Sequence, residues 1–134
     1  MSQENVEVVS QGFDDWRAGR IAEWAETVDL DIEWDTSAHP LPDFPDRGRG
    51  RDALVRHMYD YLAGWNDYEA TPEEVLDGGD EVVLIVHERA RMRGSDVILD
   101  RDLPTVWTVR DGRNVRFRVF KTRAQALEAA GVRQ

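Results

Sequence analysis

The stretch Val106-Trp-Thr-Val-Arg-Asp-Gly-Arg-Asn-Val115 decides the fold of this chain. Its first four residues are β-branched or aromatic, as is typical of a strand, and successive side chains of a strand point to opposite faces of a sheet. Arg110-Asp111-Gly112 then reverses the chain, because an Asp-Gly pair between two such runs favours a tight hairpin turn. A second strand over residues 115–120 therefore returns antiparallel to the first.

The same period of two extends upstream of this hairpin. Strands are predicted over residues 68–77, 82–93 and 97–109, with turns at Gly78-Gly79-Asp80 and Gly94-Ser95-Asp96 between them. Pro72 weakens the start of the first of these strands, because proline has no backbone N–H to donate. Together with the strand over residues 115–120, they form an antiparallel meander.

Counting from Trp107 assigns the side chains of these strands to two faces of the sheet. The inward positions of the last two strands are Arg101, Leu103, Thr105, Trp107, Val109, Val115, Phe117 and Val119, and Arg116 and Arg118 face outward. On the strand over 82–93 the inward set is Val82, Leu84, Val86, Glu88, Ala90 and Met92, because the other choice would point Arg89 and Arg91 into the core. Val83, Ile85 and Val106 then make an apolar stripe on the outer face, beside His87, which we interpret as a homodimer surface.

The first half of the chain is helical in pattern. Apolar residues at steps of three and four predict an amphipathic helix with Val6, Val9, Phe13 and Trp16 on one face and Gly19 as its terminator. A short helix over 21–28, a strand over 32–36 with Ile32 and Trp34 inward, and a helix from Asp52 to Gly64 follow. The segment with His39, Pro40, Pro42, Pro45 and the run Arg47 to Arg51 is predicted to be a loop. Thr122 caps a last helix that ends at Gly131.

Composition limits the classes of function. The 134 residues, 41% of them hydrophobic, are the size of a single domain over 1–134. A net charge of −10 opposes nucleic-acid binding, and no apolar run or N-terminal leader pattern indicates a membrane, so we expect a cytoplasmic protein. The chain has no cysteine, and its three histidines have no metal-ligand spacing, so we expect neither thiol chemistry nor a metal cofactor.

Several local motifs resemble one family. They are E-N-V-E-V-V at residues 4–9, D-L-D-I-E-W at 29–34, R-G-R-D-A-L at 49–54 and V-W-T-V-R-D-G-R-N-V at 106–115. With the order of the elements, they resemble the SnoaL-like, nuclear-transport-factor-two-like superfamily, which includes ketosteroid isomerase-like enzymes and polyketide cyclases. The resemblance implies an α+β, cystatin-like cone: a strongly curved mixed or antiparallel sheet wrapped around three N-terminal helices, with a short C-terminal helix. It also implies a cofactor-free pocket for a small molecule.

Asp35 is the catalytic candidate that the resemblance suggests. A count along D-L-D-I-E-W-D places it where ketosteroid isomerase-like enzymes carry their proton-shuttling carboxylate, and a carboxylate in an apolar pocket becomes a base near neutral pH. The same count places Gly12 and Thr105 where those enzymes carry their oxyanion donors. The alternative interpretation is that Asp35 is a solvated residue at the end of a strand.

His57 and Glu88 are the other catalytic candidates. His57 shares a helix face with Leu54, Met58 and Tyr61, so its imidazole either reaches the pocket, poised for proton transfer, or is a satisfied histidine between helix and sheet. Glu88 and Arg101 face inward on adjacent strands and are expected to pair, because buried charges are seldom left alone. That pair either holds the structure together or orients a polar substrate or a water molecule.

A lining for the pocket follows from the inward positions. The predicted substrate-binding residues are Trp16, Trp34, Met58, Tyr61, Arg101, Thr105, Trp107 and Phe117. Their rings suit a flat, mostly apolar ligand such as a polyketide, terpenoid or steroid, whereas the alternative is a filled core. Three hypotheses result: an isomerase, cyclase or hydratase acting by proton transfer on an apolar carbonyl compound, a non-catalytic binding or sensing protein, and a filled cone that serves dimerisation only.

Overall fold

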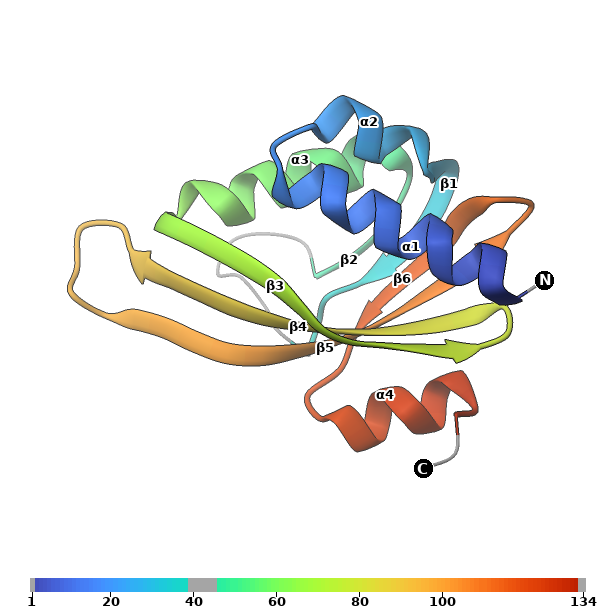
Figure 1. Cartoon of the computed structure of the whole chain (residues 1–134). Helices are drawn as coiled ribbons and strands as arrows, with labels where there is room; N and C mark the ends of the chain where they lie inside the picture. Colours follow the sequence, from blue (N-terminus) through green and yellow to red (C-terminus); the bar gives the residue numbers. More distant parts are fainter. Residues whose placement is uncertain (1, 39–45, 133–134) are drawn as a thin grey trace.

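The computed structural model describes residues 2–38 and 46–132. The helices of the first half of the chain lie over one face of a curved sheet, and the C-terminal helix lies on the other face (Figure 1). The first half of the chain contains α1 (Ser2–Arg17), α2 (Ile21–Glu26), β1 (Val28–Asp35), β2 (Arg47–Arg49) and α3 (Arg51–Ala63). The second half contains β3 (Trp65–Gly78), β4 (Glu81–Met92), β5 (Ile98–Arg110), β6 (Arg113–Val119) and α4 (Arg123–Ala130). This arrangement confirms the predicted α+β cone.

The sheet is mixed, with the strand order β2-β1-β6-β5-β4-β3. The predicted antiparallel meander from β3 to β6 is confirmed, and β1 joins it by pairing parallel to β6. The prediction of a continuous loop is wrong at Arg47–Arg49, because these residues form β2 antiparallel to β1. A strand of three residues has no period of its own, so only its partner specifies it. His39, Pro40, Pro42 and Pro45 lie outside the described residues.

The inner face of the sheet carries the main core, with two departures from the predicted pattern. Val82, Leu84, Val86, Trp107, Val109 and Phe117 pack there with Val9, Phe13, Ile32 and Trp34, as predicted. Met92 is 42% exposed, because the end of β4 projects beyond the helices. Asn114 takes the inward place predicted for Val115, because the pairing shifts from Thr108 with Arg116 to Val109 with Asn114. Such a bulge puts one extra residue into β6 and turns its side chains.

The outer face of the sheet is partly covered by α4. Thr122 caps this helix, its Oγ1 accepting from Gln125 N at 3.1 Å, and Gly131 ends it with a φ of +70°. The apolar stripe of Val83, Ile85 and Val106 packs against Ala126, Leu127 and Ala130 of α4. The prediction that this stripe is a dimer surface is therefore wrong for these three residues, because their own chain buries them. The homodimer itself stays a prediction.

No helix within residues 2–38 and 46–132 is both long and apolar enough to cross a membrane.

Candidate functional site

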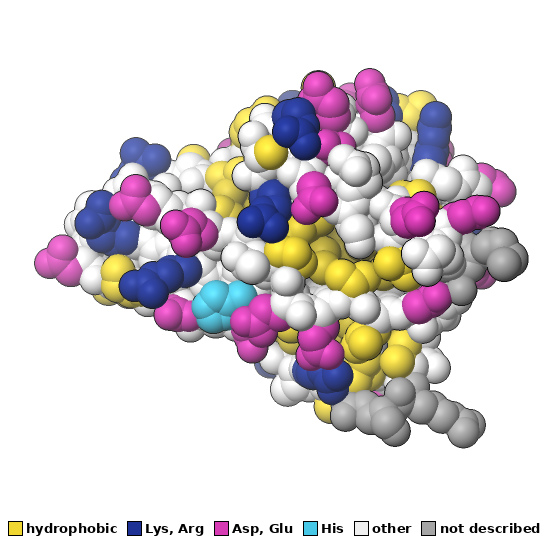
Figure 2. All heavy atoms as spheres, in the orientation of Figure 1, with side chains coloured by type: hydrophobic (Ala, Val, Ile, Leu, Met, Phe, Trp, Pro, Cys, Tyr) yellow, Lys and Arg dark blue, Asp and Glu magenta, His cyan; other side chains and the backbone are white. Residues whose placement is uncertain are grey.

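A cavity of about 90 Å³ lies between the three N-terminal helices and the inner face of the sheet. Most of its wall is apolar and aromatic, with Phe13, Trp16, Trp24, Tyr68, Trp107 and Phe117 among its residues. Figure 2 shows hydrophobic side chains between α1 and the sheet, on a surface where acidic and basic groups are otherwise interspersed. One water molecule needs about 10–15 Å³ of such volume, so the cavity has room for a small organic molecule or a handful of waters.

A buried carboxylate stands at one wall of the cavity. Glu88 is only 1% exposed, and its Oε2 accepts hydrogen bonds from the hydroxyls of Tyr61, at 2.8 Å, and Tyr68. Its Oε1 accepts from Nε and Nη2 of Arg101, both at 3.1 Å. The predicted pair of Glu88 and Arg101 is thereby confirmed, and the two residues are register partners on β4 and β5. With four donors aimed at it, this carboxylate is satisfied without a ligand.

The two tyrosines act as hydrogen-bond donors to this carboxylate. Burial, reinforced by the charge of Glu88, raises the pKa of both Tyr61 and Tyr68 far above its usual range. Both hydroxyls therefore stay protonated at neutral pH. Tyr68 was not among the predicted site residues, although alternation along β3 away from Ala70, the partner of Glu88, places it inward.

His57, on α3, forms a second polar point in the wall. Its side chain is buried, its ring stacks on Trp34 with centroids 4.7 Å apart, and its Nε2 lies 3.1 Å from Thr36 Oγ1. The Thr36 hydroxyl lies 3.4 Å from the carbonyl of Asp46, and when it donates there it accepts from Nε2–H of His57. That tautomer leaves the lone pair on Nδ1, which is buried without a hydrogen-bond partner in the described part of the chain.

The environment of His57 keeps its imidazole neutral. Burial lowers the pKa of His57 below the ordinary 6.5, and the negative charge of Asp60 opposes this shift without cancelling it. A neutral imidazole with an unprotonated nitrogen accepts a proton from a bound molecule. Of the two interpretations left open by the sequence, the satisfied histidine holds for Nε2 only.

Two further polar atoms of the cavity-lining residues have no partner. Trp16 Nε1, a donor, and Asn114 Oδ1, an acceptor, are buried and form no hydrogen bond among the described residues. Asn114 Nδ2 lies 3.4 Å from Thr27 Oγ1, which fixes the orientation of the amide. Asn114 was missed because only the bulge in β6 turns it inward. Buried polar atoms without partners are rare in proteins, so these two mark places where a ligand atom or a water is expected.

Asp35 lies outside this cavity. Its side chain is 39% exposed, and its carboxylate accepts from Ser37 N at 2.9 Å and Ser37 Oγ at 2.6 Å, with Arg47 Nε 3.4 Å away. Partial burial acts to raise the pKa of Asp35, but the hydrogen bonds from Ser37 and the charge of Arg47 outweigh it and lower the pKa below 3.8. The expected carboxylate base in an apolar pocket is therefore not formed by Asp35, because β1 ends with this side chain turned to the surface.

Of the predicted substrate-binding residues, most line the cavity and two do not. The structure brings six of the predicted substrate-binding residues to the cavity: Trp16, Met58, Tyr61, Thr105, Trp107 and Phe117. Trp34 instead supports the ring of His57, and Arg101 stands behind Glu88. The Thr105 hydroxyl donates to Leu84 O at 2.7 Å and accepts from Trp107 Nε1 at 3.1 Å, so it offers no free donor to a ligand.

A sequence profile of SnoaL-like domains matches residues 9–117, which run from the middle of α1 to near the end of β6. The chain belongs to the SnoaL-like domain family. This SnoaL-like domain also resembles solved structures over almost its full length. The matched residues include His57, Glu88 and Asn114, but the profile itself assigns no reaction to them.

Three solved structures illustrate the likeness. An NTF2-like protein of unknown function from Burkholderia pseudomallei matches with a TM-score of 0.78 and 14% identity, covering 93% of this chain and 95% of that one. A putative polyketide cyclase from Sinorhizobium meliloti matches with 0.70 and 22%, covering 90% and 99%. A protein with a ketosteroid isomerase-like fold from Catenulispora acidiphila, in complex with trimethylamine, matches with 0.72 and 13%, covering 95% and 94%. At such identities the likeness concerns the fold, and no curated protein matches this chain.

Proposed function

We propose that this SnoaL-like domain binds a small, mostly apolar carbonyl compound in its cone and that His57 moves a proton of that compound. The observation that carries the proposal is the unpartnered, buried Nδ1 of His57 in the wall of an apolar cavity. A neutral histidine in that state acts as a base, because its Nδ1 carries no proton and receives no hydrogen bond from a neighbouring group. The reaction class is an isomerisation, cyclisation or hydration that needs no cofactor.

The size of the cavity limits the ligand. A dry engineered cavity of about 150 Å³ in another protein takes up benzene, so 90 Å³ suits a molecule of one small ring or less. A polyketide or steroid of several rings would need the aromatic wall to move. The proposal therefore narrows the ligand to a compact carbonyl compound with one or two polar groups.

In this proposal, two polar atoms of the cavity wall act on different parts of such a ligand. Trp16 Nε1–H donates to the carbonyl oxygen as negative charge develops on it, and His57 Nδ1 removes the proton from the neighbouring carbon. Glu88 is not the base in this scheme, because its oxygens already accept from Tyr61, Tyr68 and Arg101. Its role is to hold the two tyrosine rings in the wall.

A second function, binding without turnover, is favoured by a different observation. Gly12 in the wall has no side chain to donate, and the hydroxyl of Thr105 is committed to Leu84 and Trp107. A developing enolate would then rely on the single N–H of Trp16, whereas a loss of one such donor elsewhere costs about 3 kcal/mol of transition-state stabilisation. A protein that binds or senses the ligand needs none of these donors.

One experiment separates the two functions. Small cyclic ketones are titrated into the protein while tryptophan fluorescence is recorded, and exchange of their α-protons for deuterium is followed by NMR in D2O. We expect binding in the parent and in both variants His57→Gln and Asp35→Asn. Exchange should be fast in the parent and in Asp35→Asn, and slower by about a hundredfold or more in His57→Gln, since general base catalysis contributes at least that much.

The other outcomes are equally informative. Binding of equal strength in all three proteins, with no accelerated exchange in any, would reject the enzyme and leave the binding protein. Absence of binding by every ketone, together with unchanged fluorescence, would reject both. If Asp35→Asn lost the exchange, Asp35 at the end of β1 would be the base, and His57 would not.

A further inference from the structure

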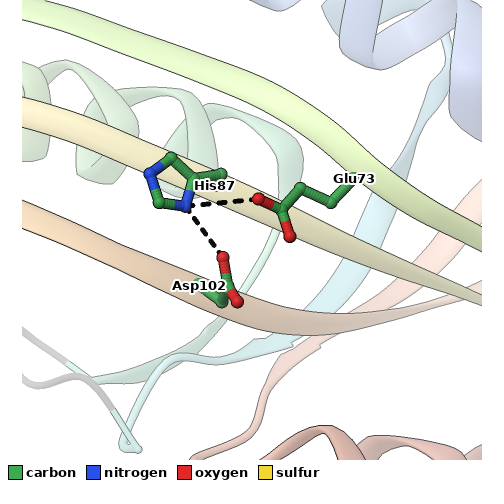
Figure 3. Close-up of side chains that lie close together, drawn as sticks. All are labelled: Glu73, His87 and Asp102. Atoms are coloured by element: carbon green, nitrogen blue, oxygen red, sulfur yellow. Dashed lines mark hydrogen bonds and ion pairs between the residues drawn. The ribbon is translucent and has the colours of Figure 1, made fainter.

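A histidine surrounded by carboxylates lies on the outer face of the sheet, on the opposite side from the cavity. His87 Nδ1 is 3.4 Å from Glu73 Oε1 and 2.8 Å from Asp102 Oδ1, and its Nε2 is 2.7 Å from Asp100 Oδ1. Figure 3 shows the carboxylates of Glu73 and Asp102 directed at the same ring nitrogen. We call these four residues the outer cluster.

Three neighbouring strands build the outer cluster. Asp102 on β5 is the register partner of His87 on β4, and Asp100 lies two residues earlier on the same face. Glu73 is the extra residue at a bulge in β3, where the pairing with β4 skips from Pro72 to Glu74. A bulge re-aims a side chain, and here it brings a third strand's carboxylate to the imidazole.

The charge of the outer cluster is not balanced. Three carboxylates face one imidazole, and no lysine or arginine within residues 2–38 and 46–132 forms an ion pair with any of them. Arg89 is the register partner of Asp100 but makes no ion pair with it. An excess of negative charge around a nitrogen ligand attracts a divalent cation more strongly than a monovalent one.

We propose that the outer cluster binds a divalent transition-metal ion of the zinc class through His87 Nδ1, Glu73 and Asp102. The three ligand atoms lie within 4.8 Å of one another. Ligands of a tetrahedral zinc, with bonds of about 2.1 Å, are roughly 3.4 Å apart, so small movements of exposed side chains complete the set. Solvent would supply the remaining position.

Asp100 places a third carboxylate on the far side of the ring. Its Oδ1 lies 2.7 Å from Nε2 of His87. A metal ion on Nδ1 would leave the proton of the ring on Nε2, beside this carboxylate, as is common for metal-ligating histidines. A lone pair facing two carboxylates is repelled unless a cation lies between them. In the metal-free protein that cation is the proton on Nδ1, and a metal ion would take its place.

Proton and metal therefore compete for the same nitrogen. Nδ1, which lies 2.8 Å from Asp102 Oδ1, binds a metal ion only after it has lost its proton. Metal binding therefore releases a proton, and the affinity for the metal falls in acid.

The test is calorimetric titration of the full chain with ZnCl2 at pH 7.5 and at pH 6.0. We expect one Zn²⁺ per chain, with weaker binding at the lower pH. His87→Gln and Asp102→Asn should each weaken binding by roughly tenfold or more. Glu69→Gln, which removes an exposed carboxylate from β3 outside the outer cluster, is the matched control and should bind as the parent does.

Thermal unfolding gives a second readout on the same proteins. Zn²⁺ should raise the Tm of the parent and of Glu69→Gln, because the ion links three strands, and should leave the Tm of His87→Gln unchanged. Far-UV circular dichroism checks that each variant is folded. Binding that does not saturate near one equivalent, or that His87→Gln and Asp102→Asn leave intact, would overturn the proposal and show only loose association with an acidic surface.

Discussion

Two consecutive register pairs of β4 and β5 meet opposite environments. Glu88 and Arg101 lie on the inner face, where Glu88 lines the cavity and its carboxylate is 1% exposed and accepts four hydrogen bonds. His87 and Asp102, one residue away on each strand, face solvent, where the excess negative charge is tolerated. Water screens charges on the outer face, whereas burial on the inner face requires that each charge be paired. The same two strands thus carry a closed network inside and an open one outside.

The largest difference between the two faces should appear when each pair is broken. Arg101→Met leaves the Glu88 carboxylate buried beside two tyrosines and should lower the free energy of unfolding by about 3 kcal/mol, the lower end of the range for broken buried pairs. Asp102→Asn on the outer face should have a much smaller effect. Urea unfolding at pH 7 measures both. Equal losses in the two variants would contradict the contrast between the faces.

Whether the sequence predicts a feature of these two faces depends on how far apart in the sequence the interacting residues lie. The inward choice for Glu88 and its pairing with Arg101 followed from alternation along two strands, which is local information. The covering of Val83 by α4 and the turning of Asn114 into the cavity depend on segments distant in sequence. Only the assembled sheet specifies a bulge or a docked helix.

In the candidate site, too, local patterns predicted some features, and residues distant in sequence determine the others. His57 was placed at the pocket by helical spacing, but its free Nδ1 depends on Thr36 and the carbonyl of Asp46, which no local pattern contains. Asp35 was assigned by counting along a family motif, and the count does not show where a strand ends. The outer cluster was missed because Glu73 reaches His87 only through the bulge at Pro72.

Gly48 of β2 supports the ring of His57 through the indole of Trp34. A Cβ at Gly48 of β2 would overlap the indole of Trp34, on which the ring of His57 stacks. Gly48→Ala should therefore lower stability by about 1–3 kcal/mol, as overpacking does, and slow any proton exchange catalysed by His57. Gly64→Ala is the control, because a Cβ there meets only ordinary contacts at a φ of −80°. If Gly48→Ala left both stability and exchange intact, β2 would not support the site.

His57 and His87 should make the free energy of unfolding depend on pH in opposite directions. Burial lowers the pKa of His57 in the folded protein, so stability is lost as pH falls from 6.5 through that lowered value. The hydrogen bond to Asp102 raises the pKa of His87, so its contribution is present below 6.5 and is lost as pH rises through the raised value. Urea midpoints between pH 5 and 8 should show the acid-side loss removed in His57→Gln and the alkaline-side loss removed in His87→Gln. The reverse assignment would contradict the account.

The proposed role of His57 as a base depends on where its ring carries the proton. A long-range proton–nitrogen NMR spectrum of uniformly ¹⁵N-labelled protein, recorded across pH, reports the tautomer and the pKa of each imidazole. We expect His57 to carry its proton on Nε2, to keep Nδ1 unprotonated at pH 7 and to titrate below 6.5. A proton on Nδ1 at pH 7, or a titration above 6.5, would contradict this role, because the cavity would then contain no free base.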